Sequence, residues 1–332
     1  MHSRKIIQFH NLNPDLVINL AEKNLGATCT NLCRPLNSYI NRVFELQLED
    51  GEGVVAKFYR PGRWSKTAIQ EEHDFLLELT AHEIAVIAPL TLQNGLTLGQ
   101  EGNMFFALFP KKSGRNYDEF MPDQWLELGR LMGRVHMIGA AQRPKERLTM
   151  TPKTFTGQQV NFILEGELIP AELKSKFFKI CNSFITENDK LFKKTEMIRI
   201  HGDCHFTNII YRPGESFFLI DFDDMVVGPP IQDLWMLLPD LPENSLREID
   251  LFLEGYETFR KFDLQSINLI EPLRAMRFIH FTAWCAHQAT EEGFAQLIQG
   301  WGTPEFWQQE IAEMEDQLTR IKERSNLASY FT

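Results

Sequence analysis

The sequence predicts an α+β fold in two parts, with strands in the first 110 residues and helices dominating the rest. Strand-like alternation of apolar and polar residues occurs between residues 36 and 110, whereas apolar residues at helical spacing recur from Pro122 to about Lys322. At 332 residues, 43% of them apolar, the chain is long enough for two packed parts. We therefore predict a smaller β-rich domain over residues 1–110 and a larger, mainly helical domain over residues 111–332.

Charge and cysteine content restrict the possible partners. A net charge of −11 argues against binding to nucleic acid or an anionic membrane, since both need clustered Lys and Arg. The five cysteines are odd in number, and no second pair of zinc ligands follows Cys29 and Cys33. Reduced thiols are the simplest account. No stretch is long and apolar enough for a membrane span. We expect a cytoplasmic monomer with no nucleic-acid or membrane partner.

The N-terminal part has clear start and stop signals. Apolar periodicity predicts one helix over residues 14–25 and another that begins after Ser65 as N-cap and ends at Ala81. The strand patterns predict a β-hairpin over residues 36–48 and 54–59 and further strands over 84–92 and 105–110, before a charged linker over 111–115.

Lys57 lies inside an apolar strand. Burying an ammonium group without an anion is costly, so either Lys57 has an anionic partner or it points to water from an edge strand.

The C-terminal part is helical by the same criteria. From Pro122, a buried helix face is expected, and Gly129 and Gly133 would let a second helix approach closely. A loop-rich stretch over 139–156 and helices over 171–190, 246–262, 269–290 and 304–322 follow. His136 is expected to be a packed or capping histidine rather than a base.

Two polar stretches are the strongest functional signal. The first is His-Gly-Asp-Cys-His-Phe-Thr-Asn over residues 201–208, and the second is Ile-Asp-Phe-Asp-Asp over 220–224. Strand, turn and strand patterns between them predict a hairpin that brings Asn208 back towards Asp221. Phosphoryl transfer from a nucleotide needs a carboxylate that accepts the proton of the attacking hydroxyl and oxygen ligands that hold magnesium on the phosphates. Asp203 suits the first role, and Asn208 and Asp221 suit the second.

Four other interpretations of these stretches compete with phosphoryl transfer. Zinc ligation by His201, Asp203, Cys204 and His205 is disfavoured because neighbours this close cannot all converge on one ion. A Cys204 nucleophile lacks an evident oxyanion-stabilising group. Calcium binding by the acids at 221, 223 and 224 lacks the twelve-residue loop. If these acids only stabilised turns and had no catalytic role, the spacing of Asp203, Asn208 and Asp221 would have no explanation.

The spacing of these residues resembles a known superfamily. The spacing matches the catalytic-loop pattern of protein kinases, because four residues separate Asp203 from Asn208. The following Asp221-Phe222 matches their metal-site pattern. His-Gly-Asp in place of His-Arg-Asp, and Asp-Phe-Asp in place of Asp-Phe-Gly, resemble the aminoglycoside phosphotransferase and choline kinase branch of the protein-kinase-like superfamily. Longer strings resemble the bacterial stress response kinase A family from about residue 8 to 310; they are PLNSY at 35–39, AKFYRP at 56–61, HGDCH at 201–205, QDLWMLL at 232–238 and IEPLRAMR at 270–277.

The resemblance implies a two-lobed protein-kinase-like fold that binds ATP and Mg²⁺. It implies that Asp203 and Asp221 are catalytic, Asp203 as base, and that Asn208 and Asp221 hold the magnesium. It assigns Lys57 to the ATP phosphates, with a glutamate of the next helix as its partner. Glu71 and Glu72 both qualify, and Glu72 matches the family pattern better.

Two further nucleotide contacts come from the same resemblance. The expected glycine-rich motif is absent, and Ser38 in Asn-Ser-Tyr takes its place as an ATP contact through its hydroxyl or amide. The backbone of residues 107–109 is expected at the hinge, which makes Phe109 an ATP-binding residue. Asp233 resembles the acid that anchors the catalytic loop. His201 is expected to brace that loop. Asp223 and Asp224 have no match in the kinase pattern, so they are candidates only for supporting the metal ligands.

The implied activity is that of an ATP- and Mg²⁺-dependent serine/threonine protein kinase of the bacterial stress response. The alternative is a kinase of a small hydroxyl compound such as an aminoglycoside, choline or homoserine, because the same catalytic residues serve both classes. A non-enzymatic binding module is disfavoured by the intact catalytic set. Glu271, Arg274 and Arg277 are expected either to form surface ion pairs or to line the acceptor site. Gly202 replaces the arginine that meets a phosphorylated activation segment in protein kinases, so we predict a constitutively competent enzyme.

Overall fold

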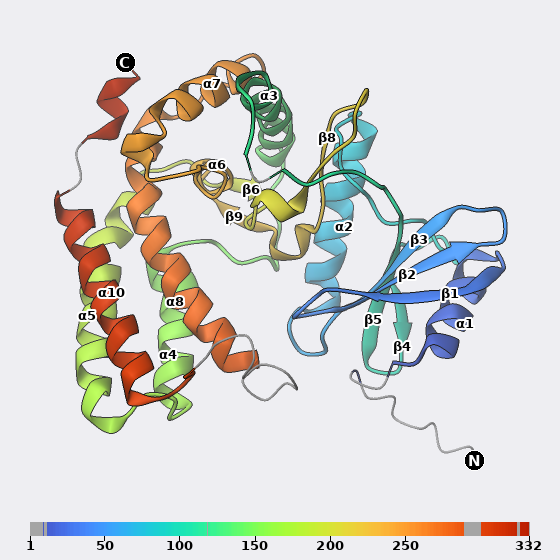
Figure 1. The fold of residues 1–332 in the computed structure, drawn as a ribbon, viewed down its shortest axis with the longest axis horizontal. Helices are drawn as coiled ribbons and strands as arrows, with labels where there is room; N and C mark the ends of the chain where they lie inside the picture. The colour runs from blue at the N-terminus through green and yellow to red at the C-terminus, as the bar shows by residue number, and fades with distance from the viewer. Residues whose placement is uncertain (1–8, 10–11, 118, 289–299, 324–325, 332) are drawn as a thin grey trace. The chain divides into compact units, whose positions relative to one another are not determined.

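A computed structural model describes residues 9, 12–117, 119–288, 300–323 and 326–331 (Figure 1). The chain divides into two compact units. Unit 1 comprises Met1–Asp118, Pro144–Arg147 and Phe206–Asp224, and unit 2 comprises Glu119–Arg143, Leu148–His205 and Met225–Thr332. Strands form a five-stranded sheet in unit 1, and long helices dominate unit 2, which confirms the predicted α+β class.

Unit 1 contains the main sheet and two helices. Its elements are α1 (Pro14–Leu25), β1 (Cys29–Leu36), β2 (Arg42–Leu48), β3 (Gly53–Phe58), α2 (Lys66–Ala81), β4 (Gly99–Glu101), β5 (Met104–Pro110), β7 (Ile209–Tyr211) and β8 (Phe217–Leu219). The sheet order is β1-β2-β3-β5-β4, with all neighbours antiparallel. Ser65 caps α2 as predicted, because its Oγ accepts a hydrogen bond from the amide of Ala68 at 3.1 Å.

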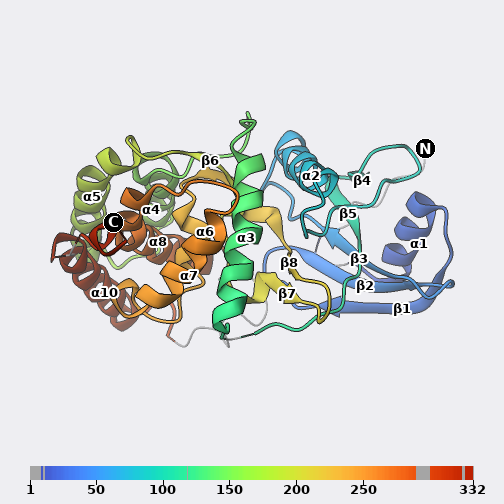
Figure 2. The same cartoon turned by 90° about the horizontal axis from the view of Figure 1, so that it is seen from above.

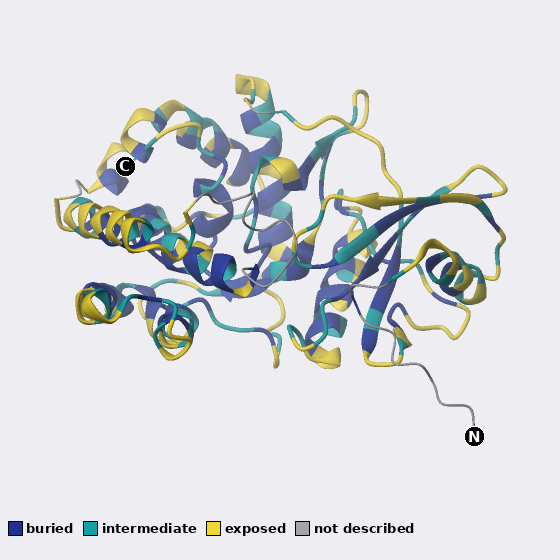
Figure 3. Cartoon of the chain, turned by 60° about the horizontal axis from the view of Figure 1, so that its bottom comes forward, coloured by how far each residue is buried: buried dark blue, intermediate teal, exposed yellow. Residues whose placement is uncertain are grey.

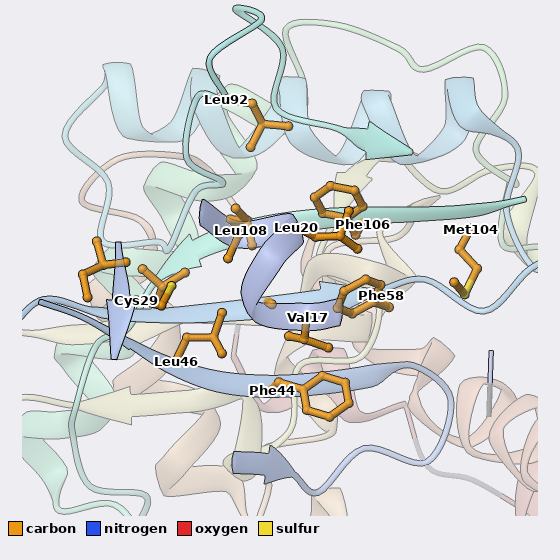
Figure 4. Packing of buried hydrophobic residues seen from close by; sticks show 14 of the residues in the cluster. Val17, Leu20, Cys29, Phe44, Leu46, Phe58, Leu92, Met104, Phe106 and Leu108 are labelled. Atoms are coloured by element: carbon orange, nitrogen blue, oxygen red, sulfur yellow. The ribbon is translucent and has the colours of Figure 1, made fainter. Parts of the chain in front are cut away.

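The two faces of this sheet carry different residues because side chains alternate along a strand. Phe44, Leu46, Phe58 and Phe106 pack with α1 residues such as Leu20 in one apolar core, shown in Figure 4. The outward side of α1 is exposed (Figure 3). Ala107 of β5 and Tyr59, which directly follows β3, face the other way and pack with Ile69 of α2. Lys57 lies between two residues of the first core, Ala56 and Phe58, so it belongs to the face covered by α2.

Two predictions in unit 1 were wrong or incomplete. Residues 84–92 do not form a strand; the described chain has only an isolated bridge between Val86 and Leu219 there. Pro89 lacks an amide proton, and the amide of Leu90 bonds singly to the carbonyl of Leu108 at 2.7 Å, so no continuous ladder forms. The strand β1 was not predicted. It lies at the sheet edge and is mostly exposed, so its sequence lacks an apolar alternation.

Unit 2 is mainly helical. Its elements are α3 (Pro122–Gly139), a π-helical turn (Pro152–Thr156), α4 (Gly157–Glu165), α5 (Ala171–Phe192), β6 (Ile198–Ile200), β9 (Val226–Gly228), α6 (Ile231–Trp235), α7 (Leu246–Tyr256), α8 (Ile270–Gln288) and α10 (Pro304–Glu323). The predicted helices are present, with three differences: α7 ends at Tyr256 rather than at residue 262, residues 289 and 290 lie outside the described residues, and α4 was not predicted. None of the helices in the described part of the chain has the length and apolar character that crossing a bilayer requires.

The helices α3 and α7 lie side by side in unit 2 (Figure 2). A Cβ on Gly129 would come within 2.1 Å of the carbonyl oxygen of Phe252, and one on Gly133 within 2.6 Å of that of Tyr256. The two glycines are therefore needed for the close approach, as predicted. The hydroxyl of Tyr256 forms a hydrogen bond with His136 Nδ1 at 3.1 Å. His136 is therefore a packed histidine between the two helices.

Candidate active site

Lys57 is the centre of a buried ion network in unit 1. Its ammonium donates a hydrogen bond to Asp221 Oδ1 at 2.7 Å and lies 3.4 Å from Asp223 Oδ1 and 3.8 Å from Glu72 Oε1. Burial alone would lower the pKa of Lys57, but the three carboxylates outweigh it and raise that pKa well above its ordinary value. Lys57 is therefore a fixed cation with anionic partners, and it does not point to water.

The choice of Glu72 over Glu71 agrees with the geometry. Glu72 is buried and faces Lys57, whereas the carboxylate of Glu71 accepts hydrogen bonds from the backbone amides of residues 145–147. Neighbouring positions on a helix point about 100° apart, so only one of the two glutamates can face β3. Burial, opposed by Lys57 and by Arg147, raises the pKa of Glu72 to about 7.

Asn208 and Asp221 lie at corresponding ends of the hairpin β7–β8. The amide of Ile220 donates to the carbonyl of Asn208 at 3.0 Å, which brings the backbones of these two predicted metal ligands together. Asp221 has a φ of +59°, a conformation that costs a residue other than glycine about 1–3 kcal/mol and occurs often at functional sites. Its side chain is 51% exposed, so this carboxylate can bind a ligand while Lys57 holds one of its oxygens.

Asp223 and Asp224 take part in the network more directly than the sequence indicated. Asp223 is buried and pairs with Lys57, with Arg63 and, at 3.2 Å, with the amide of Asn41. Arg63 also pairs with Asp224 at 2.5 Å. Burial raises the pKa of Asp223, but Arg63 and Lys57 outweigh it, so the pKa lies below its usual range. These two acids are structural ion-pair partners within unit 1.

Ser38 and Phe109 are placed less tightly. Ser38 lies in the connection between β1 and β2. Phe109 lies opposite Val55 in the β3–β5 ladder. In an antiparallel ladder every second pair of opposite residues is hydrogen-bonded, and this ladder has such bonds between Tyr59 and Phe105 and between Gly53 and Lys111. The pair Val55–Phe109 belongs to the same series, so the backbone amide and carbonyl of Phe109 face β3. Its ring meets His73 edge to face at 6.2 Å. The nucleotide contacts of Ser38 and Phe109 stay predictions. Because the backbone of Phe109 faces β3, its contact with the nucleotide would have to come from its ring.

Asp203 belongs to unit 2, where it lies on the loop after β6. Arg277 Nη1 of α8 donates to its Oδ1 at 2.6 Å, and His205 Nε2 lies 3.3 Å from its Oδ2. Burial raises the pKa of Asp203, but these two contacts outweigh it and hold the pKa below its usual range. The carboxylate is ionised at neutral pH. Arg277 thus forms an ion pair, which is one of the two roles that the sequence left open; a place at the acceptor site stays a prediction.

The loop that carries Asp203 is braced as predicted. The carboxylate of Asp233 in α6 accepts hydrogen bonds from the amides of His201 and Gly202, each at 2.8 Å. Gly202 has a φ of +86°, which explains why a glycine stands there. His201 Nδ1 accepts from the amide of Asp203 at 3.3 Å. The loop conformation is therefore fixed by buried polar groups.

The structure also tests the thiol and metal alternatives. Cys204 is fully buried, and burial raises the pKa of its thiol well above the ordinary value. A thiolate nucleophile at this position is therefore disfavoured. Within the described residues, no three His, Cys, Asp or Glu side chains are grouped as a metal site. Arg147, Arg63 and Asn41 are network residues that the sequence analysis missed, and the two arginines lie in stretches without a local signal.

The comparisons with known proteins agree with this geometry. The sequence matches the profile of the phosphotransferase enzyme family over residues 32–270. The chain belongs to the phosphotransferase enzyme family. Stress response kinase A of Escherichia coli strain K12 is 35% identical to this phosphotransferase over 316 residues, which cover 95% of each chain. Serine/threonine protein kinase RdoA of Salmonella typhimurium strain LT2 is 37% identical over 302 residues, which cover 90% of this chain and 86% of that one. The predicted membership of the stress response kinase A family is confirmed.

Solved structures confirm the fold of the phosphotransferase. Amicoumacin kinase, solved in complex with AMP-PNP, Ca²⁺ and Ami, matches with a TM-score of 0.75 at 20% identity, covering 92% of this chain and 94% of that one. A microcompartment-associated aminopropanol kinase matches with a TM-score of 0.69 at 16% identity, covering 92% and 98% of the two chains. The kinase-like α+β fold predicted from the motifs is therefore correct.

Proposed function

We propose that this phosphotransferase is an ATP- and Mg²⁺-dependent serine/threonine protein kinase of the bacterial stress response. The observation that carries the proposal is the contact of Lys57 with Asp221, backed by Glu72. A lysine on the third strand, its helix glutamate and the metal-binding aspartate form the set that protein kinases need for phosphate binding. In this proposal Lys57 binds the ATP phosphates. A cytoplasmic location and a monomeric state stay predictions.

The residues at the end of the β7–β8 hairpin fit a magnesium ion. Asn208 and Asp221 offer an amide oxygen and a carboxylate, which are the hard oxygen ligands that Mg²⁺ prefers. Because Mg²⁺ is usually held by one or two protein groups plus substrate phosphates, the absence of a larger acidic cluster among the described residues is compatible with this ion. When bound, the ion would neutralise charge on the terminal phosphates.

Asp203 would orient the acceptor hydroxyl and accept its proton. General-base assistance of this kind is worth about 10²- to 10⁴-fold in rate. The low pKa of Asp203 means that the carboxylate is ionised before the acceptor arrives. Arg277 and His205 hold its two oxygens, so an arriving hydroxyl must share or replace one of these contacts.

Two observations favour a protein acceptor over a small amine. The relative named as a serine/threonine protein kinase is 37% identical, whereas the amicoumacin and aminopropanol kinases are 20% and 16% identical. In addition, the groups that contact Asp203 are a guanidinium and an imidazole. A cationic aminoglycoside or choline would meet Arg277 unfavourably. The small-molecule kinase remains the second candidate because the same fold and catalytic residues serve it.

Transfer of labelled γ-phosphate tests the proposal. Mg-ATP is offered with a generic protein substrate and with the enzyme alone, and Asp203→Asn serves as the control. We expect label on Ser or Thr that is lost in the variant. Tight, Mg²⁺-dependent ATP binding without protein labelling would favour the small-molecule kinase and call for a screen of hydroxylated metabolites. Failure to bind ATP would contradict the whole assignment.

A further inference from the structure

A short segment of the chain is attached to α2 by an unusual set of contacts. Residues 144–147 belong to unit 1, although the chain on both sides of them belongs to unit 2. The carboxylate of Glu71 accepts hydrogen bonds from three successive amides, those of Lys145 at 2.6 Å, Glu146 at 3.1 Å and Arg147 at 3.0 Å. The segment is therefore fixed to α2 through its backbone.

The side chain of Arg147 enters the interior of unit 1. It is fully buried and uses all sides of its guanidinium group. Nη2 donates to Glu72 Oε2 at 3.0 Å, Nε donates to the carbonyl of Ala68 at 2.8 Å, and Nη1 donates to the carbonyl of Asp223 at 2.6 Å. The guanidinium also lies over the ring of Trp64 at 4.4 Å. One side chain thus joins the first turns of α2, the carboxylate of Glu72 and the turn after Asp221.

Glu72 needs this contact because its other partners are distant. Lys57 Nζ is 3.8 Å from Glu72 Oε1, and the hydroxyl of Tyr59 is 3.5 Å from the same oxygen. Asp221 and Asp223, across the network, repel the Glu72 carboxylate. Within the described chain, Arg147 makes the one charged hydrogen bond to Glu72. Breaking a charged contact of this kind in a buried site leaves an uncompensated charge.

We propose that Arg147 is a positioning residue that acts on the phosphate-binding Lys57 through Glu72. In protein kinases, the lysine–glutamate pair is controlled by the position of the helix that carries the glutamate and by phosphorylation of an activation segment. Here, residues 222–230 contain no Ser, Thr or Tyr, so that segment offers no hydroxyl for phosphorylation. Arg147 supplies a permanent cation at this place. This inference rests on the proposed role of Lys57 in ATP binding.

Binding of Mg-ATP and of adenosine to Arg147→Met, measured by calorimetry, tests the inference. Adenosine lacks the phosphates that Lys57 would contact, so it reports damage to the rest of the nucleotide site. We expect the Kd for Mg-ATP to rise about 10- to 100-fold, since a hydrogen bond to a charged group is worth about 1.5–3 kcal/mol. The Kd for adenosine should stay within about twofold of the wild-type value. Arg143→Met, an exposed arginine on the same loop, is the matched control and should bind both ligands normally.

The double variant with Glu72→Gln separates positioning from general damage. If Arg147 acts through Glu72, adding Arg147→Met to Glu72→Gln should weaken Mg-ATP binding less than about twofold further. Additive losses, or equal losses for Mg-ATP and adenosine, would overturn the inference. Arg147→Gln is judged by the same criteria if the Met variant does not fold. Wild-type protein that binds no Mg-ATP would instead overturn the proposed function.

Discussion

Glu72 and Asp223 of unit 1 and Asp203 of unit 2 are carboxylates that are held in opposite ways. In unit 1, Glu72 and Asp223 are nearly fully buried and share Lys57. Arg147 is the second cation of Glu72, and Arg63 is that of Asp223. In unit 2, Asp203 is partly exposed, and its partner Arg277 is 44% exposed. A buried network fixes its members in place, whereas an exposed pair is weak and easily exchanged. The difference suits a rigid phosphate-binding group in unit 1 and, in unit 2, a carboxylate that must exchange partners with the acceptor.

The largest expected contrast comes from the same substitution in each unit. Arg63→Gln removes a cation from the buried Asp223, and we expect it to lower the free energy of unfolding by about 2–3 kcal/mol. Arg277→Gln removes an exposed partner of Asp203, and we expect a change within about 0.5 kcal/mol. Urea unfolding of both variants measures the contrast. Equal losses of stability would show that the two carboxylates are held alike.

Acidification should affect the buried network through His73. Tyr59 links this histidine to Glu72, with its hydroxyl 2.9 Å from His73 Nε2. Burial, together with Lys57 and Arg147, lowers the pKa of His73 from 6.5 to about 3. Between these values the unfolded chain binds more protons, so stability is lost as pH falls below 6.5, by at most about 1.4 kcal/mol per pH unit.

The variant His73→Gln isolates this contribution. We compare urea unfolding of the wild type and the variant at pH 7.5 and 5.5. The wild type should lose more stability than the variant over this interval, by up to about 1.4 kcal/mol. Glu72, whose pKa is raised, acts in the opposite direction in both proteins, so the difference between them reports His73. An equal loss in both would show that His73 does not titrate within the network.

Local patterns predicted most of the fold and the positions of the motif residues. The turn between β7 and β8 and the cap at Ser65 depend on neighbouring residues, so the sequence contains the information. Local patterns failed at two places. The edge strand β1 is mostly exposed and so lacks an apolar alternation, and Pro89 interrupts the apolar stretch over 84–92 that was predicted to be a strand. The preference for Glu72 over Glu71 came from the family resemblance, and the contacts of both residues agree with it.

The network partners could not be predicted, because they come from distant parts of the chain. Arg147 reaches Glu72 across 75 residues of sequence, and Arg63 reaches Asp223 across 160. The stretch Arg-Pro-Lys-Glu-Arg at 143–147 has the composition of a solvated turn. Nothing in it indicates that the last arginine is buried while the first is exposed. Only the folded chain shows that difference.

The most direct test of the division of roles compares Asp221→Asn with Asp203→Asn. Calorimetry measures ATP binding with and without Mg²⁺, and labelled γ-phosphate measures transfer. Asp203→Asn should bind Mg-ATP like the wild type and transfer phosphate at least about 10²-fold more slowly. Asp221→Asn should lose the Mg²⁺-dependent part of binding as well as transfer. Normal Mg²⁺-dependent binding by Asp221→Asn, with impaired binding by Asp203→Asn, would contradict the account.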